Sequence, residues 1–143
     1  MGARSTSPDR VEYVIVGGYA VAFHGYPRFT KDLDIFFRNS KSNVKRIRRA
    51  LVAFGFTEED LDEGLFTDPR NIIQLGVSPL RVDIVNEIGG VGFDEATAHC
   101  VRGHYGDIEV SFIGRVELIR NKRASGRDQD RVDAEKLEKK AKQ

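Results

Sequence analysis

The sequence of 143 residues is poor in several residue types: it contains one cysteine, one methionine, four prolines and no tryptophan. Because Cys100 has no second cysteine to pair with, an internal disulfide is excluded, and a reducing cytoplasm is the expected location. No apolar run approaches the roughly 20 residues that span a bilayer. The opening residues, MGARSTSPDR, also lack the apolar segment of a signal peptide. We therefore expect no association with a membrane.

The chain also has no large excess of positive or negative charge. Lys and Arg number 23 and Asp and Glu number 22, so the formal net charge is only +1 and gives no bulk argument for nucleic-acid binding. Hydrophobic residues make up 40% of the chain and charged residues 31%, which indicates a globular protein. The length predicts one domain with one core, over residues 11–143, preceded by a flexible leader at 1–10.

Apolar runs bounded by glycine, proline and polar residues predict a mixture of strands and helices. Strands are expected at 12–16, 32–37, 71–77 and 80–86, with a hairpin over 101–112 that turns near Gly106. Helices are expected at 19–25, 42–54, 92–100 (with Asp94 as N-cap) and 115–124, and from about 128 onward. Residues 58–70 are acidic and are expected to be irregular, with one helical turn.

The helix at 42–54 is amphipathic. One face carries the four apolar residues Val44, Ile47, Leu51 and Phe54, and the remainder carries Lys45, Arg46, Arg48 and Arg49. The basic side chains are interpreted as a solvated face, and the alternative is a contact with an RNA backbone.

Two aspartates bracket one leucine in the strand at 32–37. Alternate side chains of a strand point the same way, so Asp32 and Asp34 share one face. Carboxylates held close together resist ionising together, and a divalent cation removes that conflict. All-oxygen ligands favour a hard ion such as Mg²⁺ or Mn²⁺. The alternative is an exposed strand face paired with Lys31 or Arg28.

A third carboxylate, Asp83, lies between Val82 and Ile84 in the apolar run LRVDIVN. If this strand lies beside the strand of Asp32 and Asp34, the three carboxylates converge. Such a set can hold metal ions that activate a hydroxyl and neutralise a phosphate leaving group. Asp83 is also a candidate acceptor for the proton of the attacking hydroxyl.

Two adjacent glycines, Gly17 and Gly18, separate the first strand from the helix that follows. Glycine allows a sharp turn and a close approach of phosphate to the backbone, and the N–H groups at a helix start suit an anion. The alternative is an ordinary strand-to-helix turn. A dinucleotide-binding Rossmann fold is disfavoured because the turn lacks the G-x-G-x-x-G pattern.

These motifs together resemble the nucleotidyltransferase superfamily of DNA polymerase beta. The matching residues are Val16–Gly17–Gly18, Asp32–Leu33–Asp34 and Val82–Asp83–Ile84. The chain is more closely similar to small prokaryotic nucleotidyltransferase-like proteins related to abortive-infection toxins, which show the pattern VGGxAxxxHGxxRxTxDxD. Its further matches to their motifs are Ala20, His24, Gly25, Arg28, Thr30, Lys122, Ala124, Gly126, Arg127, Asp130 and Asp133.

The resemblance implies a nucleotidyltransferase fold, with helices packed on a twisted mixed sheet. It implies that Asp32, Asp34 and Asp83 are catalytic and bind metal, and that Gly17 and Gly18 bind nucleotide. It also assigns nucleotide binding to Arg28, Thr30, Lys122 and Arg127. Alternatively, Arg28 and Thr30 only hold the connector, and Lys122 and Arg127 are surface charges that pair with Glu117, Asp130 or Asp133.

Other polar residues of these motifs are interpreted as structural. Asp130 and Asp133 lie one helical turn apart and are expected to fix Arg127. His24 is expected to pack at a helix end.

The implied function is transfer of a nucleoside monophosphate from an NTP to a hydroxyl of an RNA (tRNA-like) or protein acceptor, with Mg²⁺ or Mn²⁺ as cofactor. A toxin–antitoxin or phage-defence setting fits the resemblance. The chain offers no second domain to hold an acceptor, so a partner protein is expected to supply one. The alternative is a non-catalytic module of the same fold that binds a nucleotide or a partner.

Overall fold

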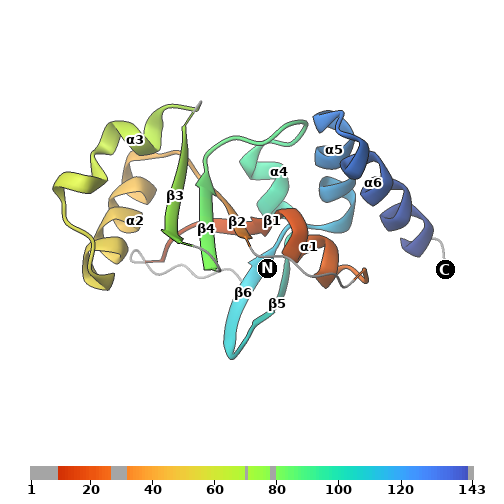
Figure 1. Ribbon diagram of the computed structural model, residues 1–143, viewed down its shortest axis with the longest axis horizontal. Coiled ribbons are helices and arrows are strands. Elements are labelled where there is room, and N and C mark those ends of the chain that lie inside the picture. The colour runs from red at the N-terminus through yellow and green to blue at the C-terminus, as the bar shows by residue number, and fades with distance from the viewer. Residues whose placement is uncertain (1–9, 27–31, 70, 78–79, 142–143) are drawn as a thin grey trace.

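The computed structural model describes residues 10–26, 32–69, 71–77 and 80–141. In this part of the chain, six strands form one mixed sheet in the order β3-β4-β2-β1-β6-β5, with helices packed around it (Figure 1). The strands are β1 (Tyr13–Val16), β2 (Asp32–Phe37), β3 (Ile72–Val77), β4 (Leu80–Val85), β5 (Val101–Tyr105) and β6 (Ile108–Phe112). The helices are α1 (Gly17–Phe23), α2 (Lys41–Phe54), the 3-10 helix η1 (Glu59–Leu61), α3 (Glu63–Thr67), α4 (Phe93–Ala98), α5 (Arg115–Ser125) and α6 (Asp128–Ala141). The predicted mixed α/β fold is confirmed.

The centre of the sheet is the strand β2. It pairs with β1 in the antiparallel direction and with β4 in the parallel direction. The outer pairs β3·β4 and β5·β6 are antiparallel, and β6 joins β1 in parallel. The strand that carries two of the predicted metal ligands is therefore flanked on both sides, and the strand that carries the third is its direct neighbour.

Each face of the sheet has its own hydrophobic cluster, as the alternation along β2 requires. Phe36 belongs to a cluster that includes Val21 of α1, Ala96 of α4 and Leu118 of α5. Phe37 points into the other cluster, which contains residues of α2 and α3. In Figure 1, α2 and α3 accordingly lie on one side of the strands and α1, α4, α5 and α6 on the other.

The helix α2 forms where its apolar face predicts it, and both of its ends are capped. The Ser40 side chain accepts a hydrogen bond from the Asn43 N–H at 3.2 Å, and the helix ends at Gly55, whose φ is +126°. Val44 and Ile47 are buried, but Phe54 is 84% exposed. Phe54 therefore continues the apolar face of α2 without being buried, because the last helical turn extends beyond the cluster that α2 covers.

The acidic segment after α2 is more ordered than its composition suggests. It contains both η1 and α3, held to the core by Leu61 and Phe66, so the expectation of a single helical turn is wrong. The N-cap of α4 is Gly92 rather than Asp94, which lies in the first helical turn. The expected leader at 1–10 lies outside the described residues except for Arg10.

The last two helices pack together beside the sheet. They are separated by Gly126, whose left-handed φ of +74° ends α5 and favours glycine. Leu118 of α5 and Leu137 of α6 are fully buried. None of the helices in the described ranges is long and apolar enough to cross a membrane.

Candidate active site

The three predicted carboxylates lie on adjacent strands and on one face of the sheet. In the parallel pair β2·β4, Asp34 is the register partner of Asp83, and Asp32 is the register partner of Arg81. Residues in register on neighbouring strands point the same way, so these four side chains form a two-by-two group, which we call the carboxylate block. Towards the other end of β2 the same face carries the core residue Phe36, so the block lies where a buried strand face emerges from the core.

Arg81, which belongs to none of the motifs identified in the sequence, lies among the carboxylates. Its Nη2 donates to Asp32 Oδ2 at 2.9 Å, and its Nε lies 3.2 Å from Asp83 Oδ1. The pattern that could have identified it is the spacing R-x-D, since residues i and i+2 of a strand share a face. The charges of the block are therefore three carboxylates and one guanidinium.

Asp34 is the carboxylate most strongly affected by its surroundings. Burial, followed by the nearby charges of Asp83 and Asp32, raises its pKa from 3.8 to about 6, while Lys122 and Arg81 act in the opposite direction. An ionised Asp34 therefore lacks sufficient compensation from the cations around it. This is the electrostatic situation that an additional cation would relieve.

The glycine turn lies directly against Asp34. Gly17 has φ +69°, and a Cβ atom at this position would lie 2.2 Å from Asp34 Oδ2. The position therefore requires glycine for two reasons: its left-handed backbone and the absence of space. Gly17 and Gly18 begin α1, and Val16, the N-cap, makes no side-chain capping bond within the described part of the chain.

A second group of charges is buried between α5 and α6. Lys122 is only 6% exposed, and its Nζ donates to Asp130 Oδ1 at 2.9 Å and lies 3.5 Å from Asp133 Oδ2. The positive charge of Lys122 lowers the pKa of Asp34, so the buried group and the carboxylate block interact electrostatically.

The side chain of Asp130 links this buried group to the turn between the two helices. Burial opposes its ionisation, but hydrogen bonds from Ser125, Lys122 and Arg127 outweigh that effect and lower the pKa of Asp130. Arg127 Nε donates to Asp130 Oδ2 at 2.8 Å, while the rest of the Arg127 side chain is 79% exposed. Asp130 thus contacts both Arg127 and Lys122, as expected. The alternative that Lys122 is a surface charge is wrong, because its side chain is buried between α5 and α6.

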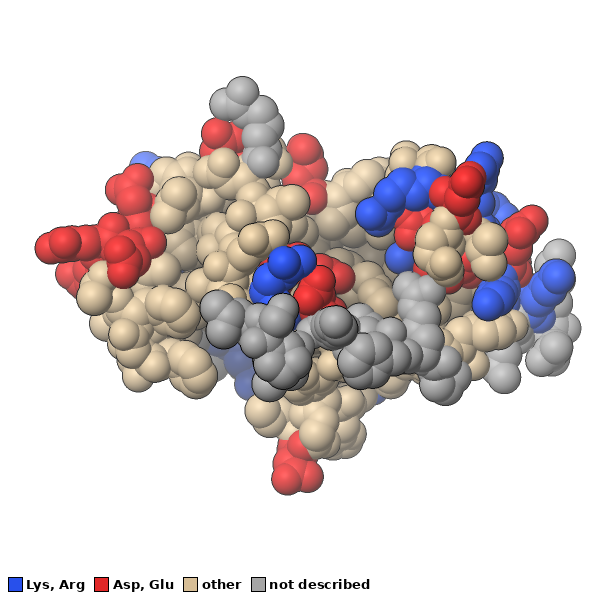
Figure 2. Space-filling model, viewed as in Figure 1, with Lys and Arg blue, Asp and Glu red and all other residues tan. Residues whose placement is uncertain are grey.

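The remaining predicted residues, Arg28 and Thr30, lie outside the described residues. On the face shown in Figure 2, charged side chains are distributed unevenly over the described part of the chain. Acidic side chains gather over η1 and α3, from Glu58 to Glu63, whereas basic and acidic side chains alternate over α5 and α6.

The donor atoms of the block are of the chemical type that a hard divalent cation prefers. Its ligands are carboxylate oxygens, Asp83 Oδ1 is buried without a hydrogen bond, and the pKa of Asp34 is raised. The spacing is nevertheless not that of a closed site: among the described residues, no three His, Cys, Asp or Glu side chains form a group that could hold a metal ion. The guanidinium of Arg81 lies against Asp32 and Asp83 instead.

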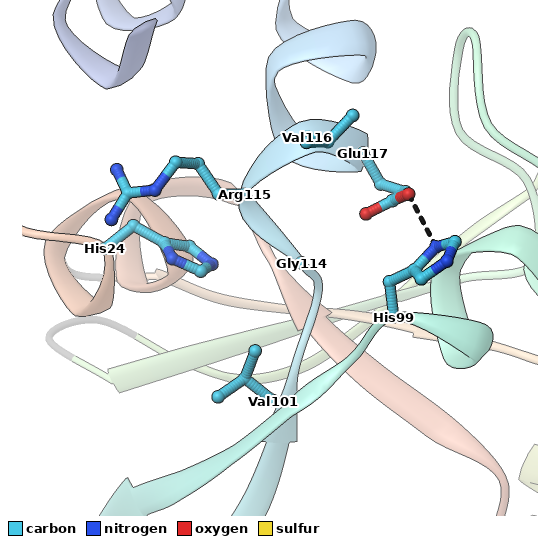
Figure 3. A pocket seen from close by; sticks show the side chains of 7 residues that line it. All are labelled: His24, His99, Val101, Gly114, Arg115, Val116 and Glu117. Atoms are coloured by element: carbon cyan, nitrogen blue, oxygen red, sulfur yellow. Dashed lines mark hydrogen bonds and ion pairs between the residues drawn. The ribbon is translucent and has the colours of Figure 1, made fainter. Parts of the chain in front are cut away.

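A separate hollow of about 500 Å³ opens at the start of α5 (Figure 3). His24 and Arg115 lie on one side of it, and His99 and Glu117 lie on the other. His99 Nδ1 and Glu117 Oε2 are 2.8 Å apart and share a hydrogen bond. His24 Nε2 donates to the Ile113 carbonyl at 2.7 Å and burial lowers its pKa, so His24 is a packed residue at a helix end, as predicted. None of the residues that line this hollow belongs to β2 or β4.

A model of a known protein family matches most of the chain. The family described as nucleotidyl transferase AbiEii toxin, type IV TA system, matches residues 1–132. The chain belongs to the AbiEii family. The predicted relation to abortive-infection toxin nucleotidyltransferases is thereby confirmed, and nucleotidyltransferase activity is implied at the level of the AbiEii family. No curated protein matches the chain.

Proposed function

We propose that this AbiEii-family chain is a metal-dependent nucleotidyltransferase that moves a nucleoside monophosphate from an NTP to a hydroxyl group. The acceptor is an RNA, of the tRNA kind, or a protein, and the setting is a toxin–antitoxin system. The observation that carries the proposal is the register of β2 and β4, which sets Asp34 beside Asp83 on the face that also bears Asp32.

The proposed reaction is an exchange of bonds at the α-phosphorus of the NTP. The acceptor oxygen bonds to that phosphorus, the bond to the bridging oxygen breaks, and pyrophosphate leaves. The hydroxyl proton passes to Asp83, whose buried Oδ1 makes no hydrogen bond and has lone pairs to accept it. Mg²⁺ or Mn²⁺, held by Asp32, Asp34 and Asp83, would neutralise the charge of the phosphates.

Other residues of the chain are proposed to hold the triphosphate. Gly17 lies against Asp34 with no side chain in the way, and the backbone N–H groups of Gly17 and Gly18 at the start of α1 are proposed to bind phosphate. An ammonium has three N–H donors, and the contacts of Lys122 with Asp130 and Asp133 fix its position while leaving donor capacity for a phosphate oxygen.

Further assignments complete the proposal. The exposed guanidinium of Arg127 is available to a ligand arriving from solvent. Arg28 and Thr30 are included through the family-like motif alone. A partner protein is proposed to bind the acceptor, and the cytoplasm is proposed as the location.

The test is transfer of label from α-labelled NTPs, with Mg²⁺ or Mn²⁺, to total RNA or protein from cells. We expect transfer by the wild type, and a loss of about 100-fold or more for Asp34→Ala, because the chemistry depends on this ligand. Asp107→Asn is the matched control, since Asp107 is an exposed residue of the β5–β6 turn. Transfer by Asp34→Ala at the wild-type rate would contradict the proposal, as would a wild type that is inactive with every nucleotide, metal and acceptor.

A second candidate is a module that binds nucleotide without turnover. The contacts of Arg81 with Asp32 and Asp83 favour it, because they occupy oxygens that a catalytic metal would need. Calorimetry separates the two: Mg²⁺-dependent binding of NTP without any transfer supports this candidate, and transfer that depends on Asp34 rejects it.

A further inference from the structure

The carboxylate block contains a cation of its own. Arg81 is the register partner of Asp32 on the neighbouring strand and lies two residues before Asp83 on its own strand. Its guanidinium reaches both, with contacts of 2.9 Å to Asp32 and 3.2 Å to Asp83. Asp32 and Asp83 are thus joined through a positive charge that the protein itself supplies.

The two contacts differ in quality. The contact of Nη2 with Asp32 Oδ2 is a hydrogen bond. The contact of Nε with Asp83 Oδ1 is an ion pair without a hydrogen bond. Both atoms are buried, and neither makes a hydrogen bond to any other group. Buried polar atoms without hydrogen bonds are energetically unfavourable. Exchange of Arg81 for a metal ion would therefore stabilise the Asp83 carboxylate.

The guanidinium is also able to leave. The Arg81 side chain is 39% exposed, and its register partner on the outer strand β3 is Gly76, which has no side chain to confine it. Its departure would change the charge of the block from −2 to −3, counting the three carboxylates and the one arginine. A divalent cation would then meet three carboxylates and no competing positive charge.

We propose that Arg81 is a positioning residue that competes with the divalent cation for Asp32 and Asp83, so that a metal ion binds only when the guanidinium leaves them. This inference rests on the proposed function for the existence of the metal site, and it adds a residue that sets the affinity of that site. It also accounts for carboxylates that share one face of the sheet without the spacing of a closed metal site.

The test is a titration of the full chain with Mn²⁺, followed by electron paramagnetic resonance of the free ion, which needs neither substrate nor turnover. We expect Arg81→Gln to bind Mn²⁺ about tenfold more tightly than the wild type, because it removes a positive charge beside a doubly charged ion. Arg81→Lys keeps the charge and is expected to bind no more tightly than the wild type.

Two controls define the site. Arg102→Gln removes an arginine from another strand pair, where Arg102 contacts Glu109, and is expected to leave Mn²⁺ affinity unchanged. Asp34→Asn is expected to weaken binding at least about tenfold, with or without Arg81→Gln, since it removes a charged ligand. Circular dichroism of every variant verifies the fold.

The outcomes separate the two proposals. Wild-type binding that depends on Asp34 but does not tighten in Arg81→Gln overturns the role of Arg81 and leaves the proposed function in place. Equal tightening by Arg81→Lys and Arg81→Gln overturns the claim that the charge competes. No binding of Mn²⁺ by either the wild type or Arg81→Gln overturns both the inference and the metal dependence of the proposed function.

Discussion

Replacement of Asp34 by asparagine is expected to stabilise this protein at neutral pH while it damages the site. Asp34 is partly buried, lies beside Asp83, and has a pKa raised to about 6. Asparagine has nearly the same shape and carries no charge. The substitution therefore removes the electrostatic penalty and preserves most of the packing against Gly17.

The size of the effect follows from the two pKa values. The pKa of an aspartate is near 3.8 in the unfolded chain and that of Asp34 is raised to about 6 in the folded protein. The difference of about 2 corresponds to at most about 3 kcal/mol, and solvent screening lowers this value because Asp34 is only partly buried. Because the folded state binds the proton more tightly, ionisation of Asp34 destabilises it. The penalty is absent below pH 3.8, grows as the pH rises, and is complete above about pH 6. Since the amide does not reproduce every contact of the carboxyl, we expect a gain of about 1–3 kcal/mol at pH 8.

The assay is urea unfolding followed by circular dichroism between pH 4 and pH 8, with Asp107→Asn as the control for an exposed aspartate. The advantage of Asp34→Asn over the wild type should shrink as the pH falls towards 4. A variant that is less stable than the wild type at pH 8, or a difference that does not vary with pH, would refute this account of Asp34.

Two further changes test the turn and the buried lysine. Gly17→Ala is expected to destabilise the fold by about 1–3 kcal/mol more than Gly106→Ala in urea unfolding, since both glycines have positive φ but only Gly17 lies against Asp34; equal costs would argue against the close approach. Lys122→Met is expected to cost about 3–5 kcal/mol because it leaves the buried Asp130 and Asp133 without their shared cation. Arg123→Gln, which breaks the exposed pair with Glu138, should change unfolding by less than about 1 kcal/mol, and a similar small value for Lys122→Met would contradict the buried network.

The sequence was most informative where local chemistry decides the structure. Local features delimit several elements: the alternation along β2, the cap at Ser40, and the positive φ values at Gly55, Gly106 and Gly126. The elements concerned, β2, α2, the β5–β6 hairpin and α5, were predicted correctly. The adjacency of β2 and β4 was a condition of the prediction rather than a result of it, because strand pairing depends on the whole chain.

The errors and omissions have a common origin. The exposure of Phe54, the two helical segments after Glu58 and the contacts of Arg81 all depend on what lies across space from these residues. A hydrophobic pattern shows which face of an element is apolar, but it does not show how far the neighbouring element extends. The pairing of Lys122 with Asp130 and Asp133 was among the alternatives that the sequence offered, but its burial between α5 and α6 was not predicted.

The parallel pairing of β2 with β4 also determines when the block can exist during folding. The two strands are joined by a long connection that must itself form α2, η1, α3 and β3. Contacts between segments so distant in the chain form slowly, because the closure of a large loop precedes their stabilisation. A growing chain therefore carries its first two aspartates without their third until β4 has emerged from the ribosome, so the chemistry proposed for this toxin family cannot begin on an incomplete polypeptide.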